Sequence, residues 1–428
     1  MQVLRLLPLV ILLSGGVQAG FQVRLKRQST DTYPQLDGKP LAAELIKPEW
    51  KAALDAAVQA GKIPNIPVSS SPDGGTPTYP SGTDMSKVCS WSTNQCQGPN
   101  DIFQAPDGVV GINFDDGPTQ ATPRLNQFLI QNNISATRFV IGGQIAGMTE
   151  TFQDILKDPN QQLAVHTYTH HQMTTLSNEV VVAELGWTMQ IIYDLSGFMP
   201  SMWRGPYGDV DNRIRAIAEE LFGLRHVSWD KDANDYCFGQ NPTTSACPGE
   251  TPGGTIESIT SYIDAALAGP KSPGVLMLEH ELSDTTVGFF EEHTWVGAQK
   301  NGWKTANVAQ MVGAPWYANA ATPTADKTKP TSVLKNASGS GSDNGNSGGS
   351  GSGSGSSSSS SSGSGTTPAG SSSTPGNPSG SIVTPTTGAV SNTTTPAKKS
   401  SALPLAVFPG LGEATIVALG AAVYTLLN

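Results

Sequence analysis

The sequence predicts an α/β fold built on a parallel sheet, and three observations support this prediction. Short apolar segments alternate with longer segments of helical spacing between residues 109 and 312. Such an alternation is typical of βαβ units, whose strands run parallel. Polar clusters follow several of the predicted strands, where barrels of this kind carry their chemistry. The sequence on either side lacks this alternation, so a single domain is expected to carry the fold.

The predicted strands and helices alternate along the chain. Runs rich in branched and aromatic residues predict strands at Val109–Phe114, Ala136–Ile141, Gln162–Val165, Met202–Trp203, His226–Trp229 and Gly274–Leu278. Apolar residues spaced three and four apart predict helices at Pro123–Gln131, Glu179–Leu195, Asp211–Glu220, Ile256–Leu267 and Thr305–Val312. The resulting sheet is either open or closed into a barrel.

The amino-terminal region has the composition of targeting and processing segments. Arg5, the apolar run Leu6–Leu13 and a small-x-Ala ending at Ala19 predict a secretory signal peptide over residues 1–19. A dibasic pair follows, so residues 20–84 are expected to be a propeptide and an extension that contains a short helix. Residues 85–318 are then expected to form the folded domain.

The carboxyl-terminal region has the composition of a stalk followed by an anchor signal. Residues 319–401 are mostly Ser, Gly, Thr and Pro, which cannot bury enough apolar surface to offset the entropy of ordering. Residues 402–428 are mostly apolar and favour a glycosylphosphatidylinositol (GPI) anchor signal. A transmembrane helix is the alternative, but Pro404, Pro409 and Glu413 leave too short an apolar run. The protein is therefore expected to be secreted and held at the plasma membrane or cell wall.

Export makes disulfide bonds possible for the four cysteines. Three pairings exist, and the two local pairs, Cys89 with Cys96 and Cys237 with Cys247, are favoured. The net charge is −10, and the isoelectric point is about 5.1. This balance excludes a typical nucleic-acid-binding protein, which needs a basic surface to neutralise phosphates.

Two clusters have the residue types of a catalytic metal site. Asp115 and Asp116 are adjacent at a predicted strand end, where a buried pair needs a cation or a proton. His166 and His170 lie four residues apart, and on a helical turn both rings would face the same metal ion. Two histidines and one carboxylate leave positions open for water and substrate, as catalytic metal sites require.

The remaining motifs supply groups for proton transfer and sugar binding. Arg204 begins the Arg-Gly-Pro-Tyr motif and can hold a carboxylate ionised. His280 ends an apolar strand and can act as a general acid, oriented by a carboxylate from the 230–235 segment. Trp229 and Tyr236 can stack on sugar rings.

Five motifs occur in the order FDDGP, HTYTH, RGPY, DANDY and LEH. In this order they resemble the polysaccharide deacetylases of carbohydrate esterase family 4, most closely the fungal chitin deacetylases. The resemblance covers Asp107 to Val312 and implies a distorted (β/α)7 barrel. It also implies that Asp115 is the catalytic base, oriented by Arg204, and that His280 is the general acid, tuned by Asp235.

The resemblance further implies one divalent metal ion, Zn²⁺ or Co²⁺, bound by Asp116, His166 and His170. Such an ion would polarise an acetamide carbonyl and lower the pKa of a bound water.

Further positions match residues that shape the substrate site of this family. Tyr207 would offer its backbone N–H to the oxyanion. Leu278, and Tyr236 where the family usually has Trp, would line the pocket for the acetyl methyl group. Asn113 replaces the usual Thr of the first motif, and little effect is expected from this change.

The function implied is metal-dependent removal of N-acetyl groups from chitin by a monomeric enzyme. An esterase acting on O-acetyl groups of xylan is one alternative, because the same catalytic set could serve it. A non-catalytic protein that binds chitin or chitosan is another, but such a relative is expected to lose Asp115, a metal ligand or His280. A structural wall mannoprotein would need all five motifs to arise by coincidence.

Overall fold

The computed structural model describes residues 32–72, 74–238 and 255–335. The predicted signal peptide, most of the stalk and the apolar end therefore lie outside the described residues. Within the described ranges, no helix combines the length and apolar character needed to cross a membrane.

Nine strands of the described residues form two parallel sheets. The first has the order β7-β8-β1-β9 and the second the order β2-β3-β4-β5-β6. The strands are β1 (Val109–Gly111), β2 (Asn113–Gly117), β3 (Ala136–Val140), β4 (Gln161–Val165), β5 (Met202–Trp203), β6 (Arg225–His226), β7 (Lys231–Asp232), β8 (Val275–Leu278) and β9 (Lys304–Ala306). A parallel bridge between Asp115 and His280 joins the sheets. Strand pairing among these residues does not close the ring, so the parallel α/β fold is confirmed as an incomplete, distorted barrel.

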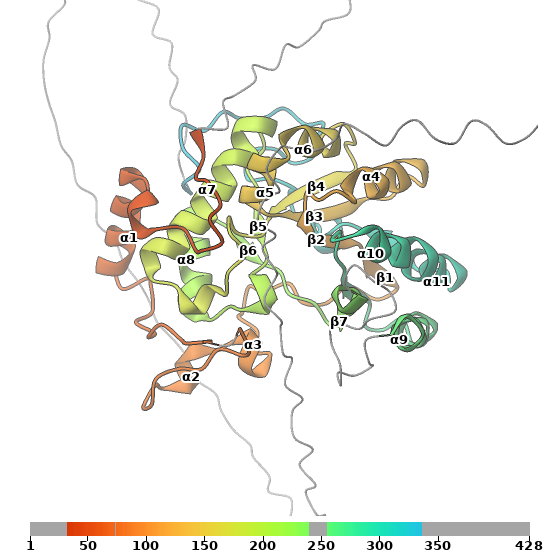
Figure 1. Cartoon of the computed structure of the whole chain (residues 1–428), viewed down its shortest axis with the longest axis horizontal. Coiled ribbons are helices and arrows are strands. Elements are labelled where there is room, and N and C mark those ends of the chain that lie inside the picture. Colours follow the sequence, from red (N-terminus) through yellow and green to blue (C-terminus); the bar gives the residue numbers. More distant parts are fainter. Residues whose placement is uncertain (1–31, 73, 239–254, 336–428) are drawn as a thin grey trace, which may run out of the picture.

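Helices surround the sheets on their outer side (Figure 1). They are α1 (Pro48–Gln59), α2 (Met85–Val88), α3 (Trp91–Asn94), α4 (Thr122–Gln131), α5 (Gly142–Gly147), α6 (Thr149–Ile155), α7 (Asn178–Ser196), α8 (Asn212–Phe222), α9 (Ile256–Ala268), α10 (Asp284–Phe289), α11 (Trp295–Lys300) and α12 (Val308–Val312). A π-helical turn, Phe290–Thr294, joins α10 to α11. The predicted helices that correspond to α4, α7, α8 and α9 are confirmed.

The predicted strand Val109–Phe114 is wrong as a single element, because it divides between the two sheets. β1 pairs with β8 and β9, whereas β2 pairs with β3. The division falls at Ile112, whose N–H donates to Ala306 of the first sheet and whose carbonyl accepts from Thr137 of the second. This one residue links the sheets and leads the chain directly to Asp115.

Two other predicted elements differ from the structure. The strand predicted at His226–Trp229 ends at His226, because the carbonyls of Val227 and Ser228 accept hydrogen bonds from Arg204. The helix predicted at Thr305–Val312 begins only at Val308, after strand β9 has paired with β1.

Residues of the predicted amino-terminal extension pack on the domain. Helix α1 contacts α7 and α8 and lies on their outer side (Figure 1). Its Trp50 is fully buried, and a Cβ at Gly186 of α7 would lie 2.7 Å from the Trp50 ring. Only glycine at this position lets the indole approach the helix, so α1 is packed as part of the core.

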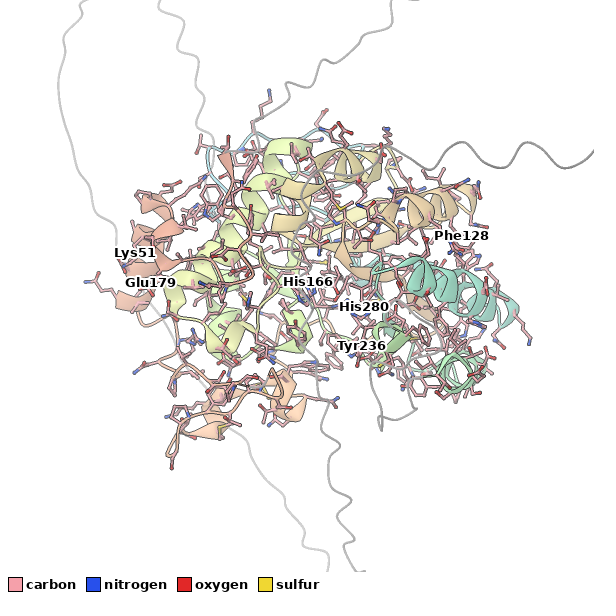
Figure 2. The ribbon with its side chains drawn as sticks, viewed as in Figure 1. Lys51, Phe128, His166, Glu179, Tyr236 and His280 are labelled. Carbon is pink, nitrogen blue, oxygen red and sulfur yellow. A yellow bond between two sulfur atoms is a disulfide. The ribbon has the colours of Figure 1, made fainter. Side chains whose placement is uncertain are left out.

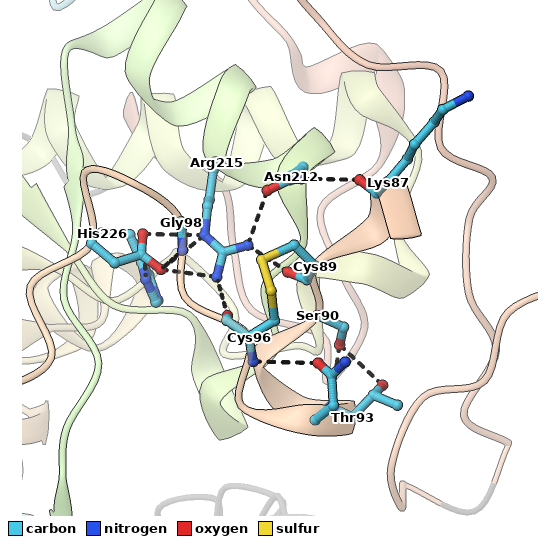
Figure 3. The surroundings of a disulfide bond; sticks show 11 residues. Lys87, Cys89, Ser90, Thr93, Cys96, Gly98, Asn212, Arg215 and His226 are labelled. Carbon is cyan, nitrogen blue, oxygen red and sulfur yellow. Dashed lines mark hydrogen bonds and ion pairs between the residues drawn. A yellow bond between two sulfur atoms is a disulfide. The ribbon is translucent and has the colours of Figure 1, made fainter. Parts of the chain in front are cut away.

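A disulfide between Cys89 and Cys96 is confirmed (Figure 3). Arg215 of α8 donates to the carbonyls of both cysteines, at 2.6 and 2.8 Å, which fixes the small loop on the domain. The loop carries Trp91, whose ring meets that of Trp229 edge-on with 5.7 Å between centroids. Cys237 is also disulfide-bonded, and its predicted partner Cys247 lies outside the described residues.

Candidate active site

A bulge at the end of β2 aims two adjacent carboxylates at one place. Successive side chains of a regular strand point to opposite faces of the sheet. Here the register shifts between Asp115 and Gly117, and Asp116 has a φ of 71°. Bulges of this kind re-aim side chains next to functional sites. As a result, both carboxylates approach Nε2 of His166, at 3.6 Å for Asp115 and 3.3 Å for Asp116.

The two histidines converge, but the helical turn predicted for them is wrong. The loop after β4 is irregular, with φ values of 63° at Thr167 and 59° at His170. The buried carboxylate of Glu184 accepts hydrogen bonds from the backbone N–H groups of Tyr168 and Thr169, at 2.9 and 2.8 Å. A side chain of α7 therefore replaces helical bonding in this loop. The ring centroids still lie 5.0 Å apart, so the two histidines meet as predicted but for a different reason.

Asp116, His166 and His170 form a cluster whose possible ligand atoms lie within 4.8 Å of one another. Nδ1 of His166 donates to the carbonyl of Arg204 at 2.9 Å, so in the neutral ring Nε2 presents a lone pair to the cluster. Among the described residues, Oδ1 of Asp116 is buried and accepts no hydrogen bond. Lone pairs that converge without a donor suit a divalent cation, and the backbone contact of His166 is typical of histidine ligands.

Burial of the Asp116 carboxyl would on its own raise its pKa, but the two histidine rings beside it hold this pKa well below its usual range. Asp116 therefore remains a carboxylate in a buried position.

Asp115 is held from the side opposite the cluster by Arg204. Nη1 of the arginine lies 2.6 Å from Oδ1 of Asp115 and donates at the same distance to Oδ1 of Asn113. The guanidinium is fully buried and lies over the ring of Phe139, 4.1 Å from its centroid. This pair keeps one Asp115 oxygen fixed and leaves the other facing His166.

A second acid–base pair lies across the strand end from Asp115. Nδ1 of His280 contacts Oδ1 of Asp235 at 2.7 Å, and the His280 backbone N–H donates to Oδ2 of Asp235 at 2.8 Å. Burial would lower the pKa of His280, but Asp235 raises it to about 10. Figure 2 shows His166 and His280 near the middle of the molecule, with Tyr236 beside His280.

The four predicted substrate-binding residues lie around these pairs. Tyr207 adopts a φ of 58° in the turn after Arg204, and its ring lies 4.8 Å from that of His170. The Tyr236 ring meets that of His280 edge-on at 5.4 Å. Leu278 is buried at the end of β8. Trp229 lies against the Arg204 guanidinium, 5.5 Å from it, and so contacts the group that holds Asp115.

Sequence reasoning missed two residues that hold the site together. Glu184 organises the histidine loop, and its only signal is a charged residue within the apolar run of α7. Asn113 was expected to matter little, yet its amide donates to Met277 of β8 while its oxygen accepts from Arg204. No motif spacing could reveal this amide contact, because it depends on how two distant strands pair.

Comparison with known proteins agrees with the motifs. The family model of the polysaccharide deacetylases matches residues 104–227. Chitin deacetylase 3 of Cryptococcus neoformans var. neoformans is 42% identical over 293 residues, which is 67% of each chain. Chitin deacetylase 1 of Cryptococcus neoformans var. grubii is 34% identical over 272 residues, 60% of this chain and 53% of that one.

Among solved structures, the chitin deacetylase of Colletotrichum lindemuthianum matches with a TM-score of 0.44 and 24% identity. The match covers 50% of this chain and 92% of that one. The similarity to chitin deacetylase 3 of Cryptococcus, which covers two thirds of each chain, identifies the family. This chain belongs to the polysaccharide deacetylases of carbohydrate esterase family 4, in the group of fungal chitin deacetylases, and is a deacetylase.

Proposed function

We propose that this enzyme removes N-acetyl groups from chitin, a β-1,4-linked polymer of N-acetylglucosamine, to give chitosan and acetate. Relatives named as chitin deacetylases support the substrate. The observation that supports the chemistry is the buried Asp116 carboxylate, whose Oδ1 has no hydrogen-bond donor and which lies between two histidines. The pairs Asp115–Arg204 and Asp235–His280 lie beside it. This arrangement suits hydrolysis of an amide rather than simple binding of a sugar.

Asp116, His166 and His170 would hold one divalent ion, Zn²⁺ or Co²⁺. When bound, the ion supplies Lewis-acid polarisation of the acetamide carbonyl. Asp115 takes a proton from the attacking water, and the Arg204 contact holds this carboxylate in position. The backbone N–H of Tyr207 stabilises the oxyanion that forms on the carbonyl oxygen.

His280 completes the reaction as the general acid. The water oxygen forms the new C–O bond, and the C–N bond then breaks as His280 donates a proton to the leaving amine. Its pKa, raised to about 10, keeps this ring protonated at neutral pH. Leu278 and Tyr236 would line the pocket for the methyl group, and Trp229 would bind the sugar chain.

The setting of the enzyme is part of the same proposal. A signal peptide and a GPI anchor would place a monomeric enzyme at the outer cell surface, with the stalk separating the catalytic domain from the membrane. These segments lie outside the described residues, except for residues 319–335. The predicted stalk boundary at 319 is wrong, because residues up to 335 pack on the domain: Val333 is buried, and the Lys335 N–H donates to the Leu221 carbonyl.

The test is acetate release by the purified protein from chitin oligomers and from acetylated xylan, measured side by side. EDTA is expected to abolish release from chitin oligomers, and Zn²⁺ or Co²⁺ to restore it. The matched control, Asp115→Asn, is expected to lose turnover while keeping the metal. Metal-dependent release of acetate from xylan alone would overturn chitin as the substrate. If neither substrate released acetate while the protein still bound chitin, the proposed enzymatic activity would be overturned.

A further inference from the structure

A cleft reaches the metal cluster, because His170 is among the residues that line it, as is Tyr207. Its volume is about 720 Å³, within the ~300–1,000 Å³ typical of ligand pockets. A cleft of this size has room for much more than the acetamide group, so it can hold sugars that flank the reacting one.

The outer wall of this cleft comes from the amino-terminal part of the chain. Leu36, Gly38 and Lys39 line one part of it, and residues 69–72 with Gly74 line another. Both segments precede residues 104–227, the part that matches the family model. The wall therefore comes from residues outside the part that the family model matches.

Buried contacts fix the first segment of the wall next to the histidine loop. The Tyr168 hydroxyl donates to the Pro34 carbonyl at 2.6 Å, and the Leu41 N–H donates to Oε1 of Glu184 at 2.9 Å. Glu184 also holds the backbone of the loop between His166 and His170. One buried carboxylate thus ties the wall and the metal ligands into a single unit.

The second segment is fixed with similar precision. Ser69 donates its N–H to the Thr174 carbonyl at 3.0 Å, and the two hydroxyls lie 2.6 Å apart. Thr174 in turn donates its N–H to Asp209 at 2.7 Å, two residues after Tyr207. Because the wall is held in place before substrate arrives, little ordering entropy is lost on binding.

The surface that the wall presents suits a neutral sugar chain. Leu36 is 52% exposed, although its side chain lies so close to Gly143 that any Cβ there would overlap it. It offers an apolar patch at the cleft, while Lys39 and Ser70 offer exposed polar groups that can meet hydroxyls. Apolar surface with a few placed polar groups is the composition of ligand sites.

We propose that Leu36, Lys39 and Ser70 form an added sugar subsite that binds units of the chitin chain beyond the reacting one. The proposal rests on the proposed function, since the reacting sugar defines where the chain enters the cleft. The wall then sets the preference for longer substrates, and a short oligomer gains nothing from it.

The test compares an N-acetylated disaccharide with the pentasaccharide, using the purified full-length protein. The variants are the double change Leu36→Ala with Lys39→Ala, and Ser70→Trp, which fills the cleft. The value of kcat/KM for the pentasaccharide is expected to fall about 10-fold because KM rises. A 10-fold change corresponds to about 1.4 kcal/mol of binding free energy. For the disaccharide it is expected to stay within about two-fold. Leu45→Ala, an exposed leucine of the same region outside the cleft lining, is the matched control and should change neither value.

The subsite would be overturned if kcat/KM for the pentasaccharide were unchanged in both variants. It would also be overturned if kcat/KM fell equally for the pentasaccharide and the disaccharide. If the wild-type protein releases no acetate, the proposed function fails, and pentasaccharide binding by calorimetry then tests the wall separately. Weaker binding in the variants than in Leu45→Ala would support the subsite, and equal binding would overturn it.

Discussion

Two buried acidic clusters meet where β2 and β8 end, and they differ in how their charges are satisfied. Glu281 pairs with Arg138, both fully buried, and also accepts from the Thr122 hydroxyl. The third nitrogen of that guanidinium donates to Asn126 at 2.8 Å. Asp116 precedes Gly117, against which Glu281 packs, and its Oδ1 contacts two histidine ring nitrogens but has no hydrogen-bond partner within the described ranges.

The difference separates a structural charge from a functional one. Buried polar groups are normally hydrogen-bonded, and a group that is not needs a reason. Both oxygens of Glu281 accept hydrogen bonds from Arg138. Glu281 also packs so closely against Gly117 that any side chain there would overlap it, so it supports the bulge at the end of β2. The missing donor at Oδ1 of Asp116 is what the proposed cation site requires. The first two of the following experiments test the two sides of this contrast, and the other two test features next to it.

The largest effect is expected from Asp116→Asn. The change removes a metal ligand, so acetate release should fall by about 10³-fold or more and the bound metal should be lost. Thermal stability measured without metal should fall far less than in Glu281→Gln, because the histidines beside Asp116 can become neutral whereas Arg138 cannot. A drop as large as that of Glu281→Gln would mean that Asp116 is a structural group like Glu281.

Glu281→Gln should show the opposite behaviour. It leaves the Arg138 charge buried and unpaired, which typically costs about 3–5 kcal/mol of the free energy of unfolding. Urea unfolding measures this loss. The double variant Arg138→Met with Glu281→Met should recover much of it, since both charges are then absent. If the free energy of unfolding fell by less than about 1 kcal/mol, as for surface ion pairs, Glu281 would not support the bulge.

Asp235→Asn should shift the pH dependence of the reaction. The pKa of His280 is about 10 in the folded protein, above the ordinary value of about 6.5, because Asp235 favours the charged ring over the effect of burial. Activity that needs protonated His280 is then lost as the pH rises through the folded pKa. The asparagine variant should lose activity at a pH at least one unit lower, with the defect growing from pH 7 to pH 9. If the loss of activity at high pH occurred at the same pH in the variant as in the wild type, His280 would not be the general acid.

The smallest effect is expected from Cys89→Ser combined with Cys96→Ser. The closed loop is short, so the entropic contribution of this disulfide is about 2–3 kcal/mol. The loop carries Trp91, which packs on Trp229 and lies far from the metal ligands in sequence. Thermal unfolding should report the loss, while metal content should not change. Loss of the metal in this variant would link the loop to the metal cluster.

The motifs predicted which side chains come together because each motif is local. Asp115 and Asp116 are adjacent, and His166 and His170 are four residues apart, so a short segment carries each pair. The alternation of apolar runs likewise predicted the parallel sheet, since it reflects burial of successive elements.

The parts that were missed depend on contacts between distant segments. The division of the first strand at Ile112 follows from hydrogen bonds to Ala306 and Thr137. The irregular histidine loop follows from Glu184, and the wall of the cleft from its contacts with residues 34 and 41. No local pattern encodes such long-range partners.

The most direct test of the metal cluster is a titration of the metal-free protein with Zn²⁺, following thermal unfolding and acetate release from chitin oligomers in the same samples. The account predicts that both quantities rise together and level off at one ion per chain, and that Asp116→Asn shows neither rise. Full acetate release before any metal is added, or an equal response in Asp116→Asn, would contradict it.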